Sequence, residues 1–445
     1  MKQPIKRIVS LTLAIAVLLA SLAFLAGCAI FTKPGVPTTY PWVFVHGLNG
    51  FGEDKLDAIA YWGGSIGGTG LMPMLRAAGY ECYAPSGAPE GSAWDRACEL
   101  YAQLTGGRVD YGKAHSEKFG QQRFGVTYSA PLFAGWGSVD ENDNLRKVNL
   151  VAHSFGGATA RLLAALLKDG DAAEREVSPD DCSPLFAGGK EDWIFSLTCL
   201  AAPHNGTSLL AWAQELINSI GGKAIIATLE SLGQSWDITR IAKLLEGIPL
   251  LDGIADALND TGRSITGKTI TDTIHLLGTP DNAYYDLGIA GAAELNLRTG
   301  VSEKMYYFSY PVDGTEFSGD NTKRVPTGEM GFAPLRIPAR IIGGWTGLAG
   351  AVTVDAAWLP NDGLVNTISA EAPFNELRED VAGAMDWTAA ETGRWYVMPV
   401  TRGDHGTLIG LGKDEAYLRA FYTELLAGID ALSLQVTGAR RPRWG

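Results

Sequence analysis

The sequence predicts an α/β fold in which a mostly parallel sheet is covered by helices. Three short apolar runs carry this prediction: residues 42 to 52 (WVFVHGLNGFG), 147 to 157 (KVNLVAHSFGG) and 192 to 206 (DWIFSLTCLAAPHNG). Each has the pattern of a strand that is buried on both faces and followed by a glycine-containing loop. Helical stretches such as residues 158 to 170 (ATARLLAALLKDG) separate such runs, as in βαβ units.

The composition is that of a globular protein with an acidic charge balance. The chain has 445 residues, 46% hydrophobic and 19% charged, which is enough for one large or two ordinary domains. It carries 36 Lys and Arg against 49 Asp and Glu, a formal net charge of −13 at pH 7. Because no long basic run interrupts this balance, we expect no nucleic-acid partner.

Residues 1 to 27 have the pattern of an export signal peptide. Lys2, Lys6 and Arg7 precede an apolar run that ends in small residues, and residues 25 to 28 read LAGC. This tetrapeptide resembles the lipobox of bacterial lipoproteins, which implies cleavage before Cys28 and acylation of that residue. Several acyl chains would anchor the protein stably to a membrane, outside the cytoplasm. The alternatives are an uncleaved spanning helix and plain secretion.

Residues 28 to 40 are the predicted tether, and residues 41 to 445 are the predicted folded domain. Residues 29 to 41 hold three prolines and little apolar content, which is typical of a linker. Within the domain, the stretch 207 to 280 changes to amphipathic helical periodicity. Its first helix presents one apolar face, formed by Leu209, Trp212, Ala213, Leu216, Ile217 and Ile220. Such helices are either packing elements or a movable cap over an apolar site.

The domain also contains Cys82, Cys98, Cys182 and Cys199. Outside the cytoplasm these thiols can form disulfides in three alternative pairings, which the sequence does not separate. We favour buried free thiols because the sequence has no CxxC or other tight spacing.

The segment 152 to 156 (AHSFG) is a variant of the G-x-S-x-G motif with alanine in the first position. A serine at a turn from strand to helix has a strained backbone, which small neighbours such as Ala152 and Gly156 tolerate. The turn also places the hydroxyl at the head of a helix, where the backbone N–H of Phe155 can stabilise an oxyanion. The pattern predicts that Ser154 is a nucleophile, and the alternative is an inert helix cap.

A serine nucleophile requires a base, and the chain has six histidines. For a serine on such a turn, the order along the chain is serine, acid, histidine. His405, in a loop after the strand-like run 394 to 400, fits this order. Asp362, in the loop LPNDGLVN, is preferred as the acid over Asp386 and Asp404 because it lies at a predicted strand end.

Eight motifs together resemble the secreted lipases of bacilli and staphylococci: VHGLNG, YWGG, WDRACELYAQLTGGRVDYGKAH, RFGVTY, VNLVAHSFGG, AAPHNGT, NDGLVNT and DHGTLIG. The resemblance covers about residues 41 to 425. It implies an α/β-hydrolase fold, hydrolysis of carboxylic esters, and a helical lid at about residues 207 to 280. The family's catalytic residues fall on Ser154, Asp362 and His405, and its oxyanion donors fall on the backbone N–H groups of Leu48 and Phe155.

The resemblance also implies a zinc site between the core and the region beyond the lid. Three of the family's four ligand positions match, at Asp95, His115 and Asp281, whereas the fourth holds Gln121. A neutral amide is a much weaker zinc ligand than imidazole, although three protein ligands and a water molecule can complete a tetrahedron. We expect a structural zinc ion of reduced affinity, and the alternative is a set of hydrogen-bonded structural polar residues.

The family's calcium site is not expected here. Its carboxylates would follow the catalytic histidine, but the chain has Thr407 and Gly412 at those positions, with Lys413 beside them. Only Gly331 matches, through a backbone carbonyl. Calcium requires several oxygen ligands with negative charge, so we predict that calcium does not bind.

These patterns predict a monomeric lipase or carboxylesterase that forms an acyl-enzyme and needs no cofactor for its chemistry. The apolar cap helices favour medium or long acyl esters as substrates. Polyester hydrolysis and acyl transfer are alternatives that use the same site. An alternative from another class is a catalytically dead surface lipoprotein that binds lipid.

Overall fold

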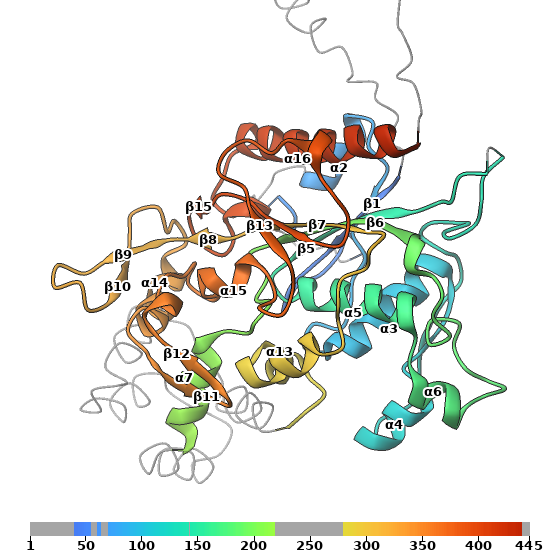
Figure 1. Ribbon diagram of the computed structural model, residues 1–445, viewed down its shortest axis with the longest axis horizontal. Coiled ribbons are helices and arrows are strands. Elements are labelled where there is room, and N and C mark those ends of the chain that lie inside the picture. The colour runs from blue at the N-terminus through green and yellow to red at the C-terminus, as the bar shows by residue number, and fades with distance from the viewer. Residues whose placement is uncertain (1–39, 55–59, 64–69, 142, 219–278, 438–445) are drawn as a thin grey trace, which may run out of the picture.

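The computed structural model describes residues 40–54, 60–63, 70–141, 143–218 and 279–437 (Figure 1). The predicted signal peptide, Cys28, the tether up to residue 39 and most of the predicted lid lie outside the described residues. Within the described ranges, no helix has the length and apolar composition needed to cross a bilayer.

A seven-stranded sheet forms the centre of the fold, and each pairing between its strands is parallel. The strand order is β13-β14-β7-β6-β5-β1-β2. In chain order the strands are β1 (Trp42–Val45), β2 (Cys82–Tyr83), β5 (Val148–His153), β6 (Ile194–Leu200), β7 (Tyr306–Tyr310), β13 (Arg378–Asp380) and β14 (Trp395–Val397). The predicted α/β fold is confirmed, and the three apolar runs form β1, β5 and β6, which are neighbours in the sheet.

Alternate side chains of the central strands enter two separate cores. Along β1, Val43 and Val45 face a core that contains α3 (Ala93–Thr105) and α5 (Gly156–Asp169). Trp42 and Phe44 face the opposite core, which contains α2 (Leu71–Ala77) and α16 (Glu415–Thr437). Figure 1 shows α2 and α16 above the sheet, with α3 and α5 below it. Helices on both faces explain why these strands are apolar without alternation.

Shorter elements complete the described chain. Three antiparallel pairs are β3 (Gly107–Asp110) with β4 (Phe124–Tyr128), β9 (Thr315–Phe317) with β10 (Arg324–Pro326), and β11 (Gly347–Ala349) with β12 (Val352–Val354). The strands β8 (Val312–Asp313) and β15 (Thr401–Arg402) pair in parallel. The remaining helices are α4 (Lys113–Phe119), α6 (Ala172–Val177), α12 (Ala283–Leu287), α13 (Ile289–Asn296), α14 (Arg336–Ile342) and α15 (Thr367–Glu371). Five 3₁₀ turns span Glu191–Trp193, Ala333–Leu335, Ala356–Trp358, Trp387–Ala389 and Thr407–Ile409.

Helix α7 (Ser208–Asn218) is the described part of the predicted lid insertion. Trp212 is buried, and Leu209 and Ala213 are partly buried, in a third apolar cluster that also contains Trp345 and Trp358. The predicted apolar face is therefore confirmed at these three positions. The other positions predicted for this face, and the helices that follow, lie outside the described side chains.

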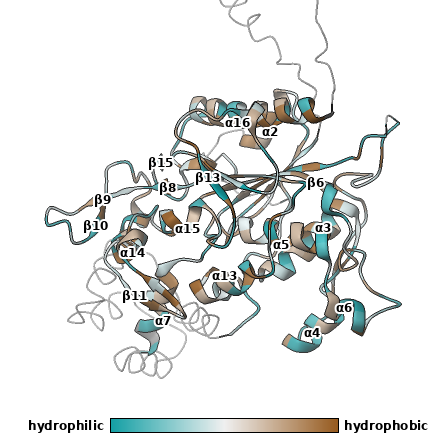
Figure 2. Cartoon of the chain, viewed as in Figure 1, coloured by the Kyte–Doolittle hydropathy of each residue, from teal (hydrophilic) through white to brown (hydrophobic). Residues whose placement is uncertain are grey.

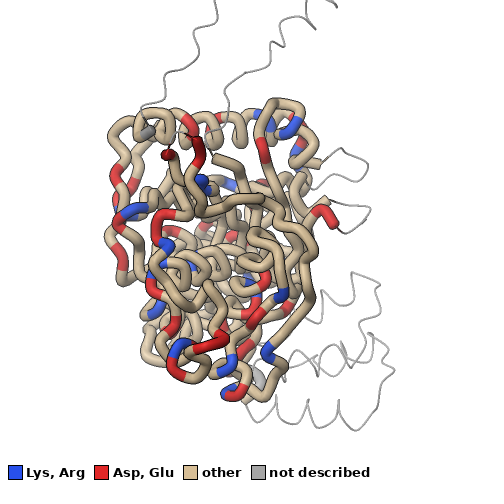
Figure 3. The backbone as a smooth tube through the Cα atoms, turned by 90° about the vertical axis from the view of Figure 1, so that its right-hand side faces the viewer, with Lys and Arg blue, Asp and Glu red and all other residues tan. Residues whose placement is uncertain are grey.

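Charged and apolar residues are distributed as in an ordinary globular protein. In Figure 2, hydrophilic and hydrophobic residues alternate around α16, as expected of a helix with one buried face. Figure 3 shows Asp and Glu positions interspersed with Lys and Arg along the described backbone. The four cysteines of the domain are free thiols, and Cys82, Cys98 and Cys199 are buried.

Helix α16 carries an unpartnered carboxyl group into the core. Asp430 is 1% exposed, and neither of its carboxylate oxygens has a hydrogen-bond partner. Its neighbours Ile429 and Leu432 belong to the core that α16 shares with α2. Burial raises the pKa of Asp430 to about 8, so the group is protonated at neutral pH.

This carboxyl group should make stability decrease with rising pH. Between about pH 4, the usual aspartate pKa, and about pH 8, the folded chain holds a proton that the unfolded chain has released. We expect Asp430→Asn to be more stable relative to wild type at pH 9 than at pH 4.5, by on the order of a few kcal/mol in the free energy of unfolding. Urea denaturation at the two pH values measures this, and an equal difference at both would contradict the prediction.

Candidate active site

Ser154 lies at the turn between β5 and α5, where the chain passes from strand to helix. Its φ is 56°, in the left-handed region that residues other than glycine rarely adopt. Two backbone hydrogen bonds hold this conformation: Ser154 N donates to Leu200 O at 3.0 Å, and Gly157 N donates to Ser154 O at 2.9 Å. The strained turn expected from the sequence is therefore present, and it lies at the carboxyl end of a central strand.

Glycines allow the chain to pass close to this turn. A Cβ atom added to Gly156 would lie 2.3 Å from the carbonyl oxygen of Val45. A Cβ atom added to Gly47 would lie 2.7 Å from the Cβ atom of Ser154. Both separations are far shorter than ordinary van der Waals contact, so the turn requires glycine at these two positions.

His405 and Asp362 lie on different loops and contact each other. His405 Nδ1 lies 2.7 Å from Asp362 Oδ2, and His405 N donates to Asp362 O at 2.9 Å. The second carboxylate oxygen, Oδ1, accepts from the backbone N–H groups of Leu364 and Val365 at 2.9 and 2.8 Å. Because an ionised carboxylate only accepts, Nδ1 of His405 carries the proton and Nε2 is left to accept one.

The other two candidate acids bond elsewhere. Asp404 Oδ2 accepts from Phe332 N at 2.8 Å, and Asp404 Oδ1 accepts from Gly406 N at 3.1 Å. Asp386 is exposed and accepts from the backbone and hydroxyl of Thr388. Of the three aspartates, Asp362 is the one whose carboxylate contacts His405.

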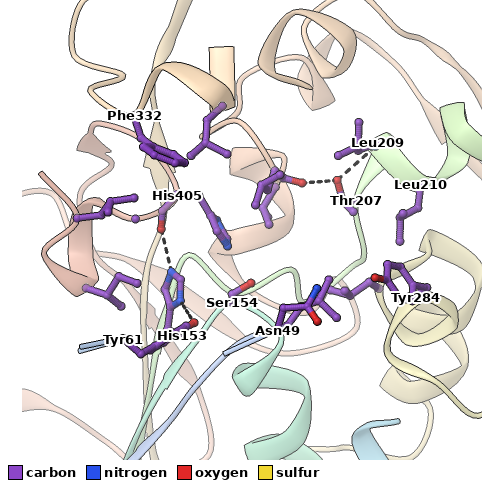
Figure 4. A pocket seen from close by; sticks show the side chains of 18 residues that line it. Asn49, Tyr61, His153, Ser154, Thr207, Leu209, Leu210, Tyr284, Phe332 and His405 are labelled. Atoms are coloured by element: carbon purple, nitrogen blue, oxygen red, sulfur yellow. Dashed lines mark hydrogen bonds between the residues drawn. The ribbon is translucent and has the colours of Figure 1, made fainter. Parts of the chain in front are cut away.

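Ser154 and His405 line one pocket of about 420 Å³. Figure 4 shows the Ser154 side chain below the His405 ring in this pocket. Its apolar walls come from separate segments of the chain and include Leu48, Leu209, Leu210, Leu287, Phe332, Leu335, Leu364, Val365, Ile409 and Leu411. A mostly apolar cavity with a few convergent polar groups is suited to a hydrophobic ligand.

Two backbone N–H groups beside Ser154 remain available as donors. Phe155 precedes the first residue of α5, and Leu48 follows β1 by three residues and lines the pocket. No hydrogen bond among the described residues uses the N–H of either residue. Both positions agree with the oxyanion donors expected from the sequence.

His153, the neighbour of Ser154, is engaged on both sides of its ring. Its Nδ1 lies 2.6 Å from Tyr61 Oη, and its Nε2 lies 2.8 Å from His405 O. Burial, together with the nearby His405, holds the pKa of His153 well below its usual value. A neutral ring with both nitrogens occupied is unsuited to act as the base.

Asp95, His115 and Asp281 also come together, at a site whose residues do not line the pocket of Ser154. Their ligand atoms all lie within 4.8 Å of one another. His115 Nε2 lies 3.1 Å from Asp281 Oδ1 and 3.7 Å from Asp95 Oδ1, but it has no partner in hydrogen-bond geometry. Burial lowers the pKa of His115, and the two carboxylates outweigh burial and raise it overall. Gln121 Nε2 donates to Asp95 Oδ1 at 3.0 Å, so the fourth predicted position also lies at this cluster.

Asp404 forms hydrogen bonds near two of the positions considered for calcium, Gly331 and Thr407. Phe332, next to Gly331, donates its backbone N–H to the carboxylate of Asp404. On the loop after His405, Thr407 Oγ1 accepts from Asp404 N at 2.9 Å. The first of these bonds joins the segment of Gly331 to the loop of His405, and the absence of calcium binding stays a prediction.

Comparison with known proteins identifies relatives over most of the chain. Residues 38–432 match the family model described as lipase-like, C-terminal domain. A lipase of Staphylococcus hyicus is 33% identical over 379 residues, which cover 83% of this chain and 53% of that protein. The chain thus spans about half the length of the curated relatives it matches.

Solved structures agree with this relationship. The crystal structure of Staphylococcus hyicus lipase superposes with a TM-score of 0.67 at 30% identity, covering 90% of this chain and 97% of the other. The structure of EstA from Clostridium botulinum gives a TM-score of 0.68 at 31% identity, covering 91% of this chain and 90% of the other. The resemblance inferred from the sequence motifs is confirmed.

Proposed function

The chain belongs to the lipase-like family that it matches over residues 38–432, and on this premise we propose that it hydrolyses carboxylic esters of apolar acids. The observation that carries the proposal is the pocket that Ser154 and His405 share, with Asp362 bonded behind His405. The chain order serine, aspartate, histidine and the contact between His405 and Asp362 support a serine hydrolase triad.

Each residue has a separate chemical task. His405 Nε2 takes the hydroxyl proton of Ser154 while the oxygen attacks the ester carbonyl. Asp362 holds the proton on His405 Nδ1 and stabilises the imidazolium that forms. His405 then gives the proton to the leaving alcohol, and water repeats the sequence on the acyl-enzyme.

The tetrahedral intermediate carries a negative oxygen that needs donors. The backbone N–H groups of Leu48 and Phe155 are both unused by the described chain and flank Ser154. We name residues 46–48 the oxyanion loop because it supplies the first of these donors. Such preorganised donors contribute most where water is excluded, as in an apolar pocket.

The pocket walls favour an acyl chain of medium or greater length. Leu209 and Leu210 of α7 form part of the lining, so the segment predicted as a lid begins at the pocket itself. For the described start of this stretch, the contact supports a role at the site in addition to packing. Polyesters and acyl transfer remain alternatives that the same residues serve.

The proposal predicts a chain-length profile that depends on Ser154. We expect purified protein to hydrolyse 4-nitrophenyl octanoate with a higher kcat/KM than the acetate, because the longer chain buries more apolar surface. Ser154→Ala should lower kcat by several orders of magnitude while the far-ultraviolet circular dichroism and Tm stay close to wild type. Hydrolysis retained by Ser154→Ala would refute the assignment, and a preference for acetate would exclude a lipase.

The cluster of Asp95, His115 and Asp281 fits a structural zinc ion. The separations of 3.1 and 3.7 Å from His115 Nε2 to the carboxylates are near the roughly 3.3 Å expected between ligands of a tetrahedral zinc ion. The buried Nε2 atom without a hydrogen-bond partner is the further feature that a metal would satisfy. We propose that these residues hold zinc, which would join α3 and α4 to the segment that precedes α12.

Metal content and thermal stability test this site. Protein purified without chelator should contain close to one zinc ion per chain by inductively coupled plasma mass spectrometry. Gln121→His should raise zinc affinity at least roughly tenfold, because imidazole replaces a weak ligand. Calcium added to metal-stripped protein should change neither Tm nor activity. Absence of zinc from both wild type and Gln121→His would contradict the proposed site.

We further propose that the protein is held outside the cytoplasm by acylated Cys28. The proposal is supported by the LAGC sequence at residues 25 to 28 after an export signal. Mass spectrometry of the mature amino terminus should find a lipid-modified Cys28, and Cys28→Ala should leave the membrane fraction without the protein. An unmodified mature terminus or an intact signal would contradict the anchor.

A further inference from the structure

The Gly47–Leu48 peptide group lies within a hydrogen-bond network that the proposed mechanism does not use. Gly47 N donates to Tyr61 Oη at 2.7 Å. Gly47 O accepts from Arg96 Nη1 at 3.1 Å, and Arg96 Nη2 donates to the carbonyl of His46. The oxyanion loop is therefore held through its main chain from two directions.

Arg96 is a buried cation whose donors point at this loop. It lies on α3, is 1% exposed, and also places its guanidinium 5.1 Å from the centre of the Phe155 ring. Burial lowers the pKa of Arg96 to about 10, which still leaves the group charged at neutral pH. Burying a charge is costly, so a charge that is kept against the Gly47 carbonyl and the Phe155 ring favours a role beyond packing.

Because the Gly47–Leu48 peptide group is planar, the bond from Arg96 to the Gly47 carbonyl also orients the Leu48 N–H. The described chain has no cis peptide bond, so the Gly47 carbonyl and the Leu48 N–H point in opposite directions from one planar group. Arg96 holds that carbonyl on the buried side of the loop. The Leu48 N–H therefore points away from Arg96, and both Leu48 and Ser154 line the pocket.

Tyr61 connects the preceding peptide group, between His46 and Gly47, to the loop of His405. A carbonyl only accepts, so the nitrogen 2.8 Å from His405 O, His153 Nε2, carries the proton. In a neutral ring Nδ1 then accepts, so Tyr61 Oη donates to it across 2.6 Å. Tyr61 Oη is left as the acceptor for the Gly47 N–H. The four groups thus form one consistently oriented series of hydrogen bonds.

Glycines bring the loop close enough to Tyr61 for this series to form. A Cβ atom added to Gly47 would lie 2.9 Å from Tyr61 Oη, and one added to Gly50 would lie 2.6 Å from Cε2 of the ring. Tyr61 also packs against Trp62 and His46, with ring centres 5.4 and 5.8 Å apart. The hydroxyl is therefore fixed rather than free to rotate toward water.

We propose that Tyr61 and Arg96 are positioning residues that aim the Leu48 N–H at the oxyanion before the substrate binds. The proposal rests on the ester hydrolase function proposed above. Donors that are already oriented need no reorganisation in the transition state, so they stabilise it more than donors that must be ordered. Loosening the peptide would weaken this stabilisation while Ser154, His405, Asp362 and both donor N–H groups stay in place.

Tyr61→Phe tests the proposal against a matched control. Tyr307 is also buried, and its hydroxyl also accepts a backbone N–H bond of 2.7 Å, from Ser302, but it does not line the pocket. We expect Tyr61→Phe to lower kcat roughly 10- to 100-fold with KM within about twofold, less than the loss of a whole oxyanion donor. Tyr307→Phe should lose comparable stability and keep kcat within about twofold of wild type.

An ester and the matching thionoester can be compared as substrates. The ratio of their kcat/KM values would not change if Tyr61 had only a structural role. A thionoester places sulfur, a weak hydrogen-bond acceptor, where the ester carbonyl oxygen would be. Weakening the oxyanion donors should slow hydrolysis of the ester more than that of the thionoester, so the ratio of the two kcat/KM values should fall at least roughly threefold in Tyr61→Phe. The ratio should stay at the wild-type value in Tyr307→Phe.

Arg96→Lys provides a second variant with its own control. Lysine keeps the charge but cannot donate to two carbonyls with a planar fork. Arg161→Lys is the match, because Arg161 is likewise buried and bonds neutral groups, Asn296 and Thr299, away from the pocket. We expect the ester-to-thionoester ratio to fall in Arg96→Lys and to remain unchanged in Arg161→Lys.

The outcomes separate this proposal from the function on which it rests. An inactive wild type would overturn the proposed function and the positioning role together. An active wild type whose Tyr61→Phe and Arg96→Lys variants keep the wild-type kcat and ratio would overturn the positioning role alone. A loss of kcat that only follows the loss of Tm, equally in test and control variants, would also overturn it.

Discussion

The left-handed backbone of Ser154 is the constraint on which the rest of this site depends. A serine at a φ of 56° is unfavourable in isolation, so the surrounding structure must impose it. The parallel strands β5 and β6 do so through the bond from Ser154 N to Leu200 O, and α5 does so from the other side. The result is a hydroxyl that projects from the edge of the sheet, with its neighbouring backbone donor already in place.

The sheet brings together residues that are remote in sequence. Asp362 and His405 lie on loops near β7 and β14, while Tyr61 and the oxyanion loop lie near β1. Because all strands of the sheet run parallel, their carboxyl ends meet at one edge, where the loops of an α/β fold converge. The hydrogen bonds of Asp362 order the loop that carries it, and that of Arg96 orders the oxyanion loop.

The sequence was sufficient to predict the central strands β1, β5 and β6 and to bring Ser154, Asp362 and His405 forward as candidates. Because both faces of β1, β5 and β6 are buried, their sequences are continuous apolar runs. The order of residues along the chain and their position in loops select Asp362 and His405 from several alternatives. Tyr61 and Arg96 were not predicted, because their partners are the main chain of Gly47 and a histidine ring, and no spacing encodes such contacts. The unpartnered Asp430 was not predicted either, since its carboxyl group differs from an exposed one only through tertiary packing.

The central claim is that Ser154 is an activated nucleophile, and covalent trapping tests it most directly. Folded protein would be incubated with an alkyl fluorophosphonate, digested, and mapped by mass spectrometry. The account predicts one phosphonyl group per chain, located on the peptide that contains Ser154. Failure of the folded protein to react, or modification at a different residue, would contradict it.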